Sequence, residues 1–440
     1  MKKTALCLAL LGLLALGGQA FAVICTIDDV PAATLLLPYF EVDLNNANGV
    51  NTLFSVNNAS ASAVLAHVVV YSDLSVPVLD FNIYLTGYDV QTVSLRDILV
   101  NGRIPRTAPP TQDTGESEPN PLPTPTAISN QGEFSEDANF PGCAGLLPAP
   151  DLPSSFIDHL RRSLTGQSSA ILSGLCAGRN LGDNIARGYI TIDTVNNCTL
   201  RLPTDPAYFT TDITDENVLW GDVFHVNPGE NFAQGETLVH IESDPLNPET
   251  SIAGEYTFYG KYVAWTAIDN REPLATNFAV RYINGGDFTG GTDLFVWRDS
   301  KVSQGPFTCP AQVGRPSWFP LGQEGIVIFD EQENPDVPTT FPVSPQPPTQ
   351  GISPFPAEAQ RTAVGGADFP VPFDFGWLYL DLNFSQANNP NPPEDPGAAQ
   401  AWVQAVMDAQ GRFSVGFDAI QLDSACNALH TGTPGSFTAQ

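Results

Sequence analysis

Two histidines lie where they could hold a metal ion together. His225 and His240 belong to apolar segments at 218–226 and 237–243, which we expect to form the two strands of one hairpin. Such a hairpin would bring the two imidazoles close to each other. The other histidines are scattered, and the zinc-protease pattern H-E-x-x-H is absent. A pair of strand histidines is more often structural, and we favour that interpretation.

Two pairs of acids have the spacing of a carboxylate-dependent hydrolase. Glu41 with Asp43, and Glu242 with Asp244, are two residues apart, which places both carboxylates of a pair on one face of a strand. A glycosidase uses two acids across the sugar bond that it cleaves. Each pair also lies at a strand end, where acids commonly cap turns, so the structural interpretation is again the simpler one.

A catalytic nucleophile has little support. The nearest approach to the pattern G-x-S-x-G is the segment 166–170, which lacks the second glycine. We therefore assign no catalytic and no cofactor-binding residue, and favour a protein that is not an enzyme.

Calcium is the ion that best suits this composition. Oxygen ligands gather in three turns, but none of them matches the EF-hand pattern. A solvated acidic turn is the better interpretation of each group, so no metal ligands are assigned. The groups are Asp43, Asn45 and Asn48; Asp212, Asp215 and Glu216; and Asp330, Glu331 and Glu333.

The tryptophans could form a surface on which sugars stack. Trp318, in the expected loop at 315–320, is the best candidate for an exposed ring that contacts a ligand. Trp220 and Trp402 hold corresponding places in two similar halves of the chain, which favours packing in a core.

The N-terminus predicts export. Lys2 and Lys3 precede an apolar run at 5–16, and residues 20–22 have the small-x-small form of a cleavage site, so we interpret 1–22 as a signal peptide. No later stretch is long and apolar enough to predict a transmembrane anchor. We expect an extracellular or periplasmic protein.

The cysteines agree with an oxidising compartment. Six remain after residue 22, and an even number in an exported chain favours three disulfides over metal ligation, since close C-x-x-C pairs are absent. Fifteen pairings are possible for six cysteines. We predict Cys25–Cys198, Cys143–Cys176 and Cys309–Cys426.

The charge balance limits the partners. The chain has 18 Lys and Arg residues against 48 Asp and Glu residues, a net charge of −30. Nucleic acids and anionic lipids are bound through Lys and Arg, so neither is an expected partner. A cell-surface glycan or protein fits better.

Strands must position all of these residues. Short apolar or alternating runs predict strands throughout, and one clear helix is expected at 155–164, with a weaker helix at 398–407. Pro-rich and polar stretches at 103–153, 334–356 and 386–397 predict long loops. The expected strands are 33–42, 51–56, 63–71, 78–85, 91–98, 188–195, 218–226, 237–243, 257–268, 276–283, 293–298, 325–330, 360–364, 376–382 and 412–422.

Short matches recur in the same order in the two halves, which favours an internal duplication. Similar strands composed of Val, Ile and Phe would give a weaker form of the same pattern. The matches are 33–34 with 275–276, 52–54 with 293–295, 68–71 with 326–329, 188–193 with 376–381, Trp220 with Trp402, and 233–235 with 409–411.

The sequence therefore predicts an all-β protein of two tandem antiparallel sandwiches of immunoglobulin-like type, 23–250 and 251–440. A single larger sandwich or a barrel is the alternative. The function that fits best is non-catalytic surface or matrix adhesion or ligand binding. Carbohydrate binding and a secreted hydrolase that uses carboxylates, with or without calcium, are the alternatives.

Overall fold

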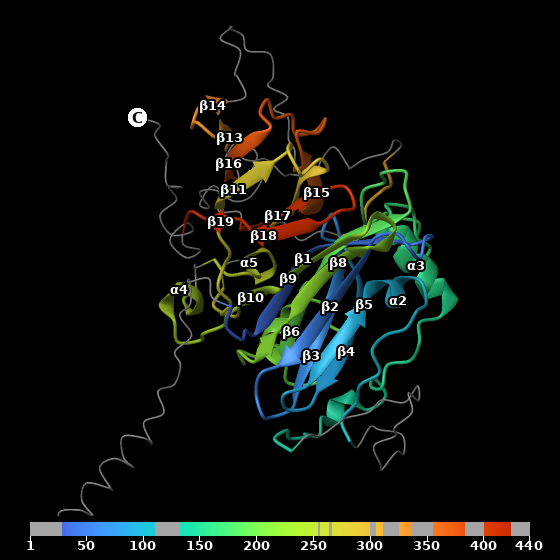
Figure 1. The fold of residues 1–440 in the computed structure, drawn as a ribbon. Helices are drawn as coiled ribbons and strands as arrows, with labels where there is room; N and C mark the ends of the chain where they lie inside the picture. Colours follow the sequence, from blue (N-terminus) through green and yellow to red (C-terminus); the bar gives the residue numbers. More distant parts are fainter. Residues whose placement is uncertain are drawn as a thin grey trace, which may run out of the picture.

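Antiparallel β-sheets are the main regular structure of the computed structural model (Figure 1). The structure describes residues 29–110, 133–253, 256–263, 266–299, 305–310, 325–336, 355–382 and 400–423. The first half contains β1 (Thr34–Asp43), β2 (Asn51–Asn58), β3 (Val64–Ser72), β4 (Pro77–Leu85), β5 (Val90–Ser94), β6 (Ile185–Val195), β7 (Leu219–Trp220), β8 (Asp222–Asn227), β9 (Phe232–Thr237) and β10 (Val239–Ile241). The second half contains β11 (Asn277–Ile283), β12 (Gly291–Arg298), β13 (Gly325–Asp330), β14 (Pro335–Asp336), β15 (Ala359–Val364), β16 (Phe375–Asp381), β17 (Ala401–Asp408), β18 (Ser414–Asp418) and β19 (Ile420–Gln421).

The two halves place their strands in the same order. The first half has sheets β10-β1-β6-β3-β4 and β5-β2-β8-β9, with β7 also paired to β2. The second half has sheets β19-β11-β16-β13-β14 and β15-β12-β17-β18. The prediction of immunoglobulin-like connectivity is wrong, because in an immunoglobulin fold the first two strands are neighbours in one sheet. Here β1 and β2 lie in different sheets.

Two of the sequence matches coincide in register. Tyr71 of β3 lies opposite Tyr189 of β6, and their rings stack with centroids 4.6 Å apart. Phe329 of β13 lies opposite Trp377 of β16 in the same way, with centroids 4.1 Å apart. The expectation that Tyr189 and Trp377 occupy matching positions is confirmed.

Three other matches need correction. Thr34 and Asn277 lie opposite Asp193 and Asp381, so the match of 33–34 with 275–276 is one residue out of register. Thr52 and Thr292 each bridge their strand to the preceding one, accepting from a backbone N–H and donating to the carbonyl of the same residue, Glu41 or Ile283. Thr52 therefore corresponds to Thr292 in the other half, so the sequence match of 52–54 with 293–295 is one residue out of register. The match of 233–235 with 409–411 is wrong, because 409–411 form the turn before β18 and β9 corresponds to β18 itself.

Two glycines mark the same close contact in both halves. A Cβ atom on Gly188 would lie 1.9 Å from the carbonyl oxygen of Tyr71, and one on Gly376 would lie 1.8 Å from that of Phe329. We expect Gly188→Ala and Gly376→Ala each to destabilise the protein by about 1–3 kcal/mol, because the strands must separate. Urea unfolding would measure this, with Gly325→Ala as the control, since its Cβ would meet nothing within 4 Å. If only one of the two variants were less stable than that control, the close contacts at Gly188 and Gly376 would not be equivalent.

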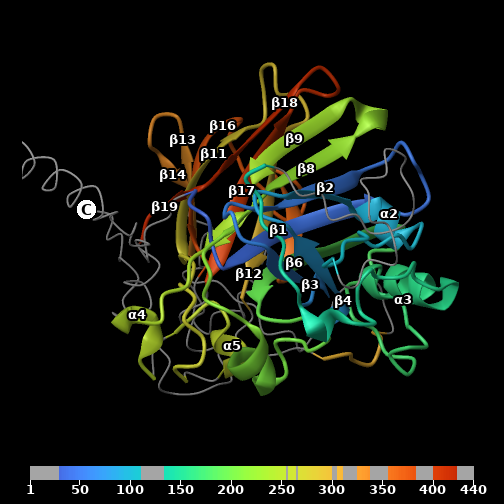
Figure 2. The same cartoon turned by 90° about the horizontal axis from the view of Figure 1, so that it is seen from below.

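One sheet of the second half lies between two hydrophobic cores. Leu294 and Val296 of β12 pack in a core with β11, β13 and β16. Phe295 and Trp297, on the opposite face of the same strand, join the core of the first half. At the edge of this sheet, β18 runs beside β9, where the Ser414 hydroxyl donates to the Ala233 carbonyl at 2.7 Å (Figure 2). The two halves therefore share buried surface.

Helices are short and lie outside the sheets. They are α2 (Leu95–Leu99), α3 (Ser154–Leu164), α4 (Pro248–Ser251) and α5 (Gly260–Val263), with single turns η1 (Pro141–Cys143), η2 (Tyr208–Asp212) and η3 (Pro228–Glu230). The prediction of α3 is confirmed. The helix expected at 398–407 is wrong, since this segment forms β17, and the strand expected at 257–268 is wrong, since it contains α5. No described helix has both the length and the apolar character needed to cross a membrane.

Several sequence predictions fall wholly or partly outside the described residues. These are the segment 1–22, the loop 386–397, and the parts of the other two loops at 111–132 and 337–354.

Candidate functional site

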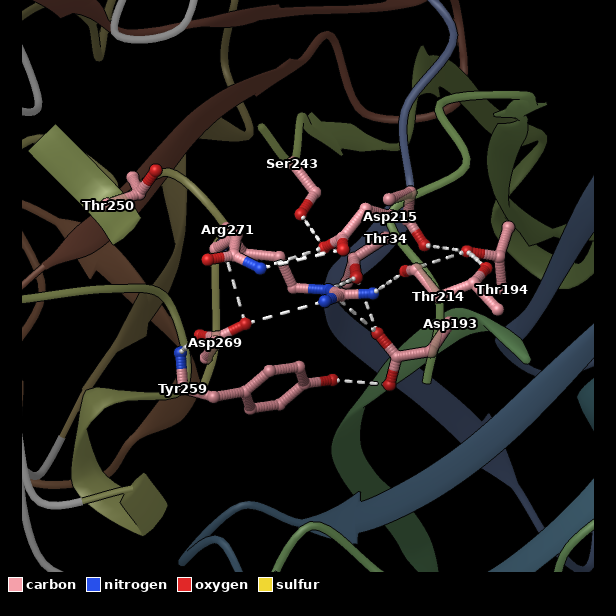
Figure 3. A network of polar contacts seen from close by, with 12 residues as sticks. Thr34, Asp193, Thr194, Thr214, Asp215, Ser243, Thr250, Tyr259, Asp269 and Arg271 are labelled. Atoms are coloured by element: carbon pink, nitrogen blue, oxygen red, sulfur yellow. Dashed lines mark hydrogen bonds and ion pairs between the residues drawn. The ribbon is translucent and has the colours of Figure 1, made fainter. Parts of the chain in front are cut away.

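A buried arginine holds the segment that connects the two halves (Figure 3). Arg271 is 1% exposed and comes from the segment 242–274, between β10 and β11. Its guanidinium forms ion pairs with Asp193 at 3.5 Å and Asp269 at 3.4 Å. It also donates to the hydroxyl of Thr34 and, at 2.8 Å, to the carbonyl of Thr214.

Asp193 lies at the centre of this cluster, on β6. Its carboxylate accepts from the hydroxyls of Thr34 at 2.5 Å, Tyr208 at 2.6 Å and Tyr259 at 2.7 Å. Burial, and then the negative charge of Asp193, raise the pKa of both tyrosines well above its usual value, so they remain donors. With every partner satisfied, the cluster acts as a clamp between β1, β6 and the connecting segment.

One open site, which we call the junction pocket, is a cavity of about 370 Å³ lined by both halves. Thr237, Val239 and His240 line it from the end of β9 and from β10, and Trp402, Asp418 and Gln421 line it from β17, β18 and β19. Asp29, Leu238 and Ala419 complete the lining. Its volume lies within the range of about 300–1,000 Å³ that is usual for small-molecule sites.

Asp418 is the group in this pocket with the most altered acidity. Burial, and then the nearby carboxylate of Glu236, raise the pKa of Asp418 to about 7. The indole Nε1 of Trp402 donates to the Asp418 carboxylate at 3.2 Å and partly offsets this. Burial lowers the pKa of His240, so this imidazole is neutral at pH 7. None of the residues that line the pocket is a lysine or arginine.

The raised pKa makes stability depend on pH in a defined direction. An unfolded Asp titrates near pH 4, so between about pH 4 and 7 the folded chain holds a proton at Asp418 that the unfolded chain has lost. Stability from this group therefore falls as the pH rises through that window. We expect Asp418→Asn to flatten the fall in melting temperature between pH 5 and 8, whereas Asp374→Asn, at an exposed position, should keep the wild-type slope. Equal slopes in all three proteins would show that Asp418 titrates normally.

The two histidines singled out by the sequence are not brought together. His225 lies on β8, and its hairpin partner is β9, whereas His240 lies on β10 in another sheet. The hairpin expectation is wrong because β9 is polar and alternates in exposure, so its strand pattern was missed. His225 contacts the hydroxyl of Thr52 at 3.2 Å, and burial lowers its pKa to about 4.

The paired acids are engaged in structural contacts. Glu41 is buried and pairs with Arg187 at 3.4 Å and Arg361 at 3.2 Å. Asp43 and Asp244 each accept backbone N–H groups in their own turns. Glu242 is buried just after β10.

The acidic turns proposed for calcium use their oxygens locally. Asp330 accepts the backbone N–H groups of Gln332 and Asn334, both at 2.8 Å. Asp212 pairs with Arg201 at 2.8 Å, and Asp215 accepts from the hydroxyl of Ser243 at 2.5 Å. Within the described part of the chain, no three His, Cys, Asp or Glu side chains converge as a metal site.

The tryptophans do not form one stacking surface in the described ranges. Trp220 and Trp402 hold corresponding positions, opposite Asn57 of β2 and Trp297 of β12. Trp402 and Trp297 are buried, whereas Trp220 is 38% exposed. Trp318, the predicted ligand contact, and Trp265 lie outside the described residues.

The described residues contain two disulfides, and the predicted pairing is wrong. The bridges are Cys143–Cys198 and Cys176–Cys309. The first joins η1 to the segment after β6, and the second joins the two halves, with Cys176 and Phe307 exchanging backbone hydrogen bonds at 2.8 and 2.9 Å. Cys25 and Cys426 lie outside the described residues.

No protein-family model matches the sequence, and no curated protein or solved structure matches it significantly.

Proposed function

We propose that the protein is an exported, non-catalytic binding protein that holds a small cationic molecule in the junction pocket. Export is supported by the signal-like N-terminus and is compatible with the two disulfides. The single observation that carries the proposal is the half-buried carboxyl of Asp418, with its raised pKa, in a pocket to which both halves contribute.

The electrostatics of the pocket favour a cation. Burial, and then the charges of Glu236 and Asp29, raise the pKa of Asp418, and no lysine or arginine lines the cavity to balance these charges. A ligand ammonium beside Asp418 would replace the proton that this carboxyl holds at neutral pH. The net charge of −30 acts in the same direction at long range, since it attracts cations and repels anions.

Binding of defined probes tests the proposal. Isothermal titration calorimetry at pH 7 with putrescine, choline, glucose and acetate should give saturable binding for the two cations. Asp418→Asn should weaken that binding at least about tenfold, the usual scale for removing a charged partner. The exposed variant Asp374→Asn should leave it unchanged.

The same experiment separates the alternatives. Saturable binding of glucose without binding of the amines would favour the carbohydrate-binding function instead. The absence of any saturable binding, or an Asp418→Asn variant that binds the amines as the wild type does, would contradict the proposal.

We also propose that the two halves arose by internal duplication of one β-sandwich unit. The common strand order, the stacked pairs Tyr71–Tyr189 and Phe329–Trp377 and the paired glycines support this. In this account the pocket arises where β9 and β10 of one copy meet β17, β18 and β19 of the other.

A further inference from the structure

A buried lysine lies away from the junction pocket. The side chain of Lys261, on α5, is 5% exposed, and its Nζ atom lies 2.5 Å from the carboxylate of Glu358 and 3.6 Å from that of Asp299. Both acids are buried, at 0% and 1% exposure of their side chains. An amine and two carboxyl groups are thus held together away from water.

Aromatic side chains enclose this group. The rings of Tyr262 and Tyr189 have their centroids 5.2 and 6.0 Å from the Lys261 amine. Trp297 packs edge-on against Tyr189 and stacks on Phe258. Such an apolar wall disfavours isolated charges and excludes the water that would hydrolyse or dilute a reacting pair.

Hydrogen bonds hold the Asp299 carboxyl through Oδ2, the oxygen that lies farther from the Lys261 amine. Its Oδ1 atom is the one nearest to Lys261, whereas Oδ2 accepts from the hydroxyl of Tyr256 and from the Gln400 amide at 3.1 Å. Two donors on one oxygen are the arrangement that stabilises negative charge developing there when the carbon is attacked.

We propose that Lys261 and Asp299 form an intramolecular amide bond, with Glu358 as the group that moves the proton. The bond would join α5 of the connecting segment to Asp299, the residue that follows β12, and would fix this segment to the second half by a covalent link in addition to the Cys176–Cys309 disulfide.

The reaction balances without a further reactant. Lys261 gives a proton to Glu358 across the 2.5 Å contact, Glu358 passes this proton to a carboxylate oxygen of Asp299, and the free amine forms a bond from Nζ to Cγ of Asp299. Glu358 then takes the second proton from the nitrogen and gives it to the hydroxyl on Cγ, and the Cγ–OH bond breaks as water leaves. The sum is one ammonium and one carboxylate converted to one amide and one water, with no change of oxidation state.

Positioning makes this condensation feasible. The amine lies 3.6 Å from Oδ1 of Asp299 in the folded chain, so the two groups that would react are already held beside each other. Well-oriented groups reach effective concentrations of about 10⁵–10⁸ M, so this positioning would accelerate the condensation. The ion pair with Glu358 already places a proton acceptor on the amine.

Mass spectrometry of the full exported chain, reduced and alkylated, tests the proposal. The wild type should be one water lighter than its sequence, about 18 Da. Fragmentation should place the loss in a branched peptide that joins Lys261 to Asp299. Lys261→Arg, which keeps the charge but cannot form the amide, and Glu358→Gln, which removes the proton acceptor, should both have the full mass.

The wild-type measurement decides the matter even if a variant fails to fold. A wild type of full mass, with Lys261 free to react with an acylating reagent after unfolding, would leave the group as an ion pair and overturn the proposal. A water loss that maps to Glu358, or to any other residue, would overturn it as well. Tyr256→Phe, which retains the ring, should form the bond more slowly, whereas the exposed variant Asp374→Asn should form it fully.

Discussion

Replacing Arg271 by Met is expected to lower the free energy of unfolding by about 3–5 kcal/mol, the usual cost of removing one partner from a buried ion pair. The variant leaves Asp193 and Asp269 in the interior without the cation that both contact at about 3.5 Å. The Met side chain fills much of the volume that the arginine leaves. The loss of stability therefore comes mainly from the uncompensated charges and less from a cavity. Urea unfolding monitored by fluorescence would measure it.

A surface pair provides the control for Arg271. Arg412 pairs with Asp287 at 3.4 Å, but both side chains are more than half exposed, so Arg412→Met should cost no more than about 1 kcal/mol. Adding Asp193→Asn to the Arg271→Met variant should recover part of the loss, since it removes one buried charge. If Arg271→Met and Arg412→Met were equally stable, the clamp would contribute nothing to the union of the halves.

Removing the Cys176–Cys309 bridge with a Cys176→Ala, Cys309→Ala double variant is expected to cost about 2–5 kcal/mol. This bridge spans 133 residues and joins the two halves, whereas Cys143–Cys198 spans 55 residues within the first half. Loop-closure entropy makes the longer bridge the more stabilising one by roughly 0.8 kcal/mol. Thermal unfolding of the two double variants side by side would measure the difference, and a larger loss for Cys143–Cys198 would contradict this ranking.

The sequence could predict the elements whose pattern is unambiguous. The correspondence of β3 with β13, and of β6 with β16, followed from apolar runs that match residue by residue, and the equal registers of the two strand pairs agree with it. The helix α3 followed from apolar residues at four-residue spacing. In these places local pattern and tertiary packing agree.

Other elements could not be read from local pattern, because their environment decides them. Residues 401–408 are buried on both faces, which removes the alternation that distinguishes a strand from a helix. The polar strand β9 lacks an apolar face. The disulfide pairing depended on which segments the sheet order brings together. The spacing of cysteines along the chain does not give that information.

The candidate site was missed for the same reason. Asp418 is one of 48 acids, and nothing in its neighbours along the chain sets it apart. Its acidity is altered by Glu236 and by burial at the junction, and both depend on β9 lying beside β18. The correspondence of Trp220 with Trp402 was the one sequence signal near it, and it indicated a core position. That signal was correct for Trp402, whose indole also contacts Asp418.

The most direct test of the proposed binding function is an NMR titration of the Asp418 carboxyl carbon, assigned with Asp418→Asn, in the absence and presence of saturating putrescine. We expect an apparent pKa of about 7 for Asp418 in the free protein and a fall of about one unit or more when the amine binds, since a neighbouring cation favours the carboxylate. A carboxyl that titrates near pH 4 in the free protein, or whose pKa is the same with and without putrescine, would contradict it.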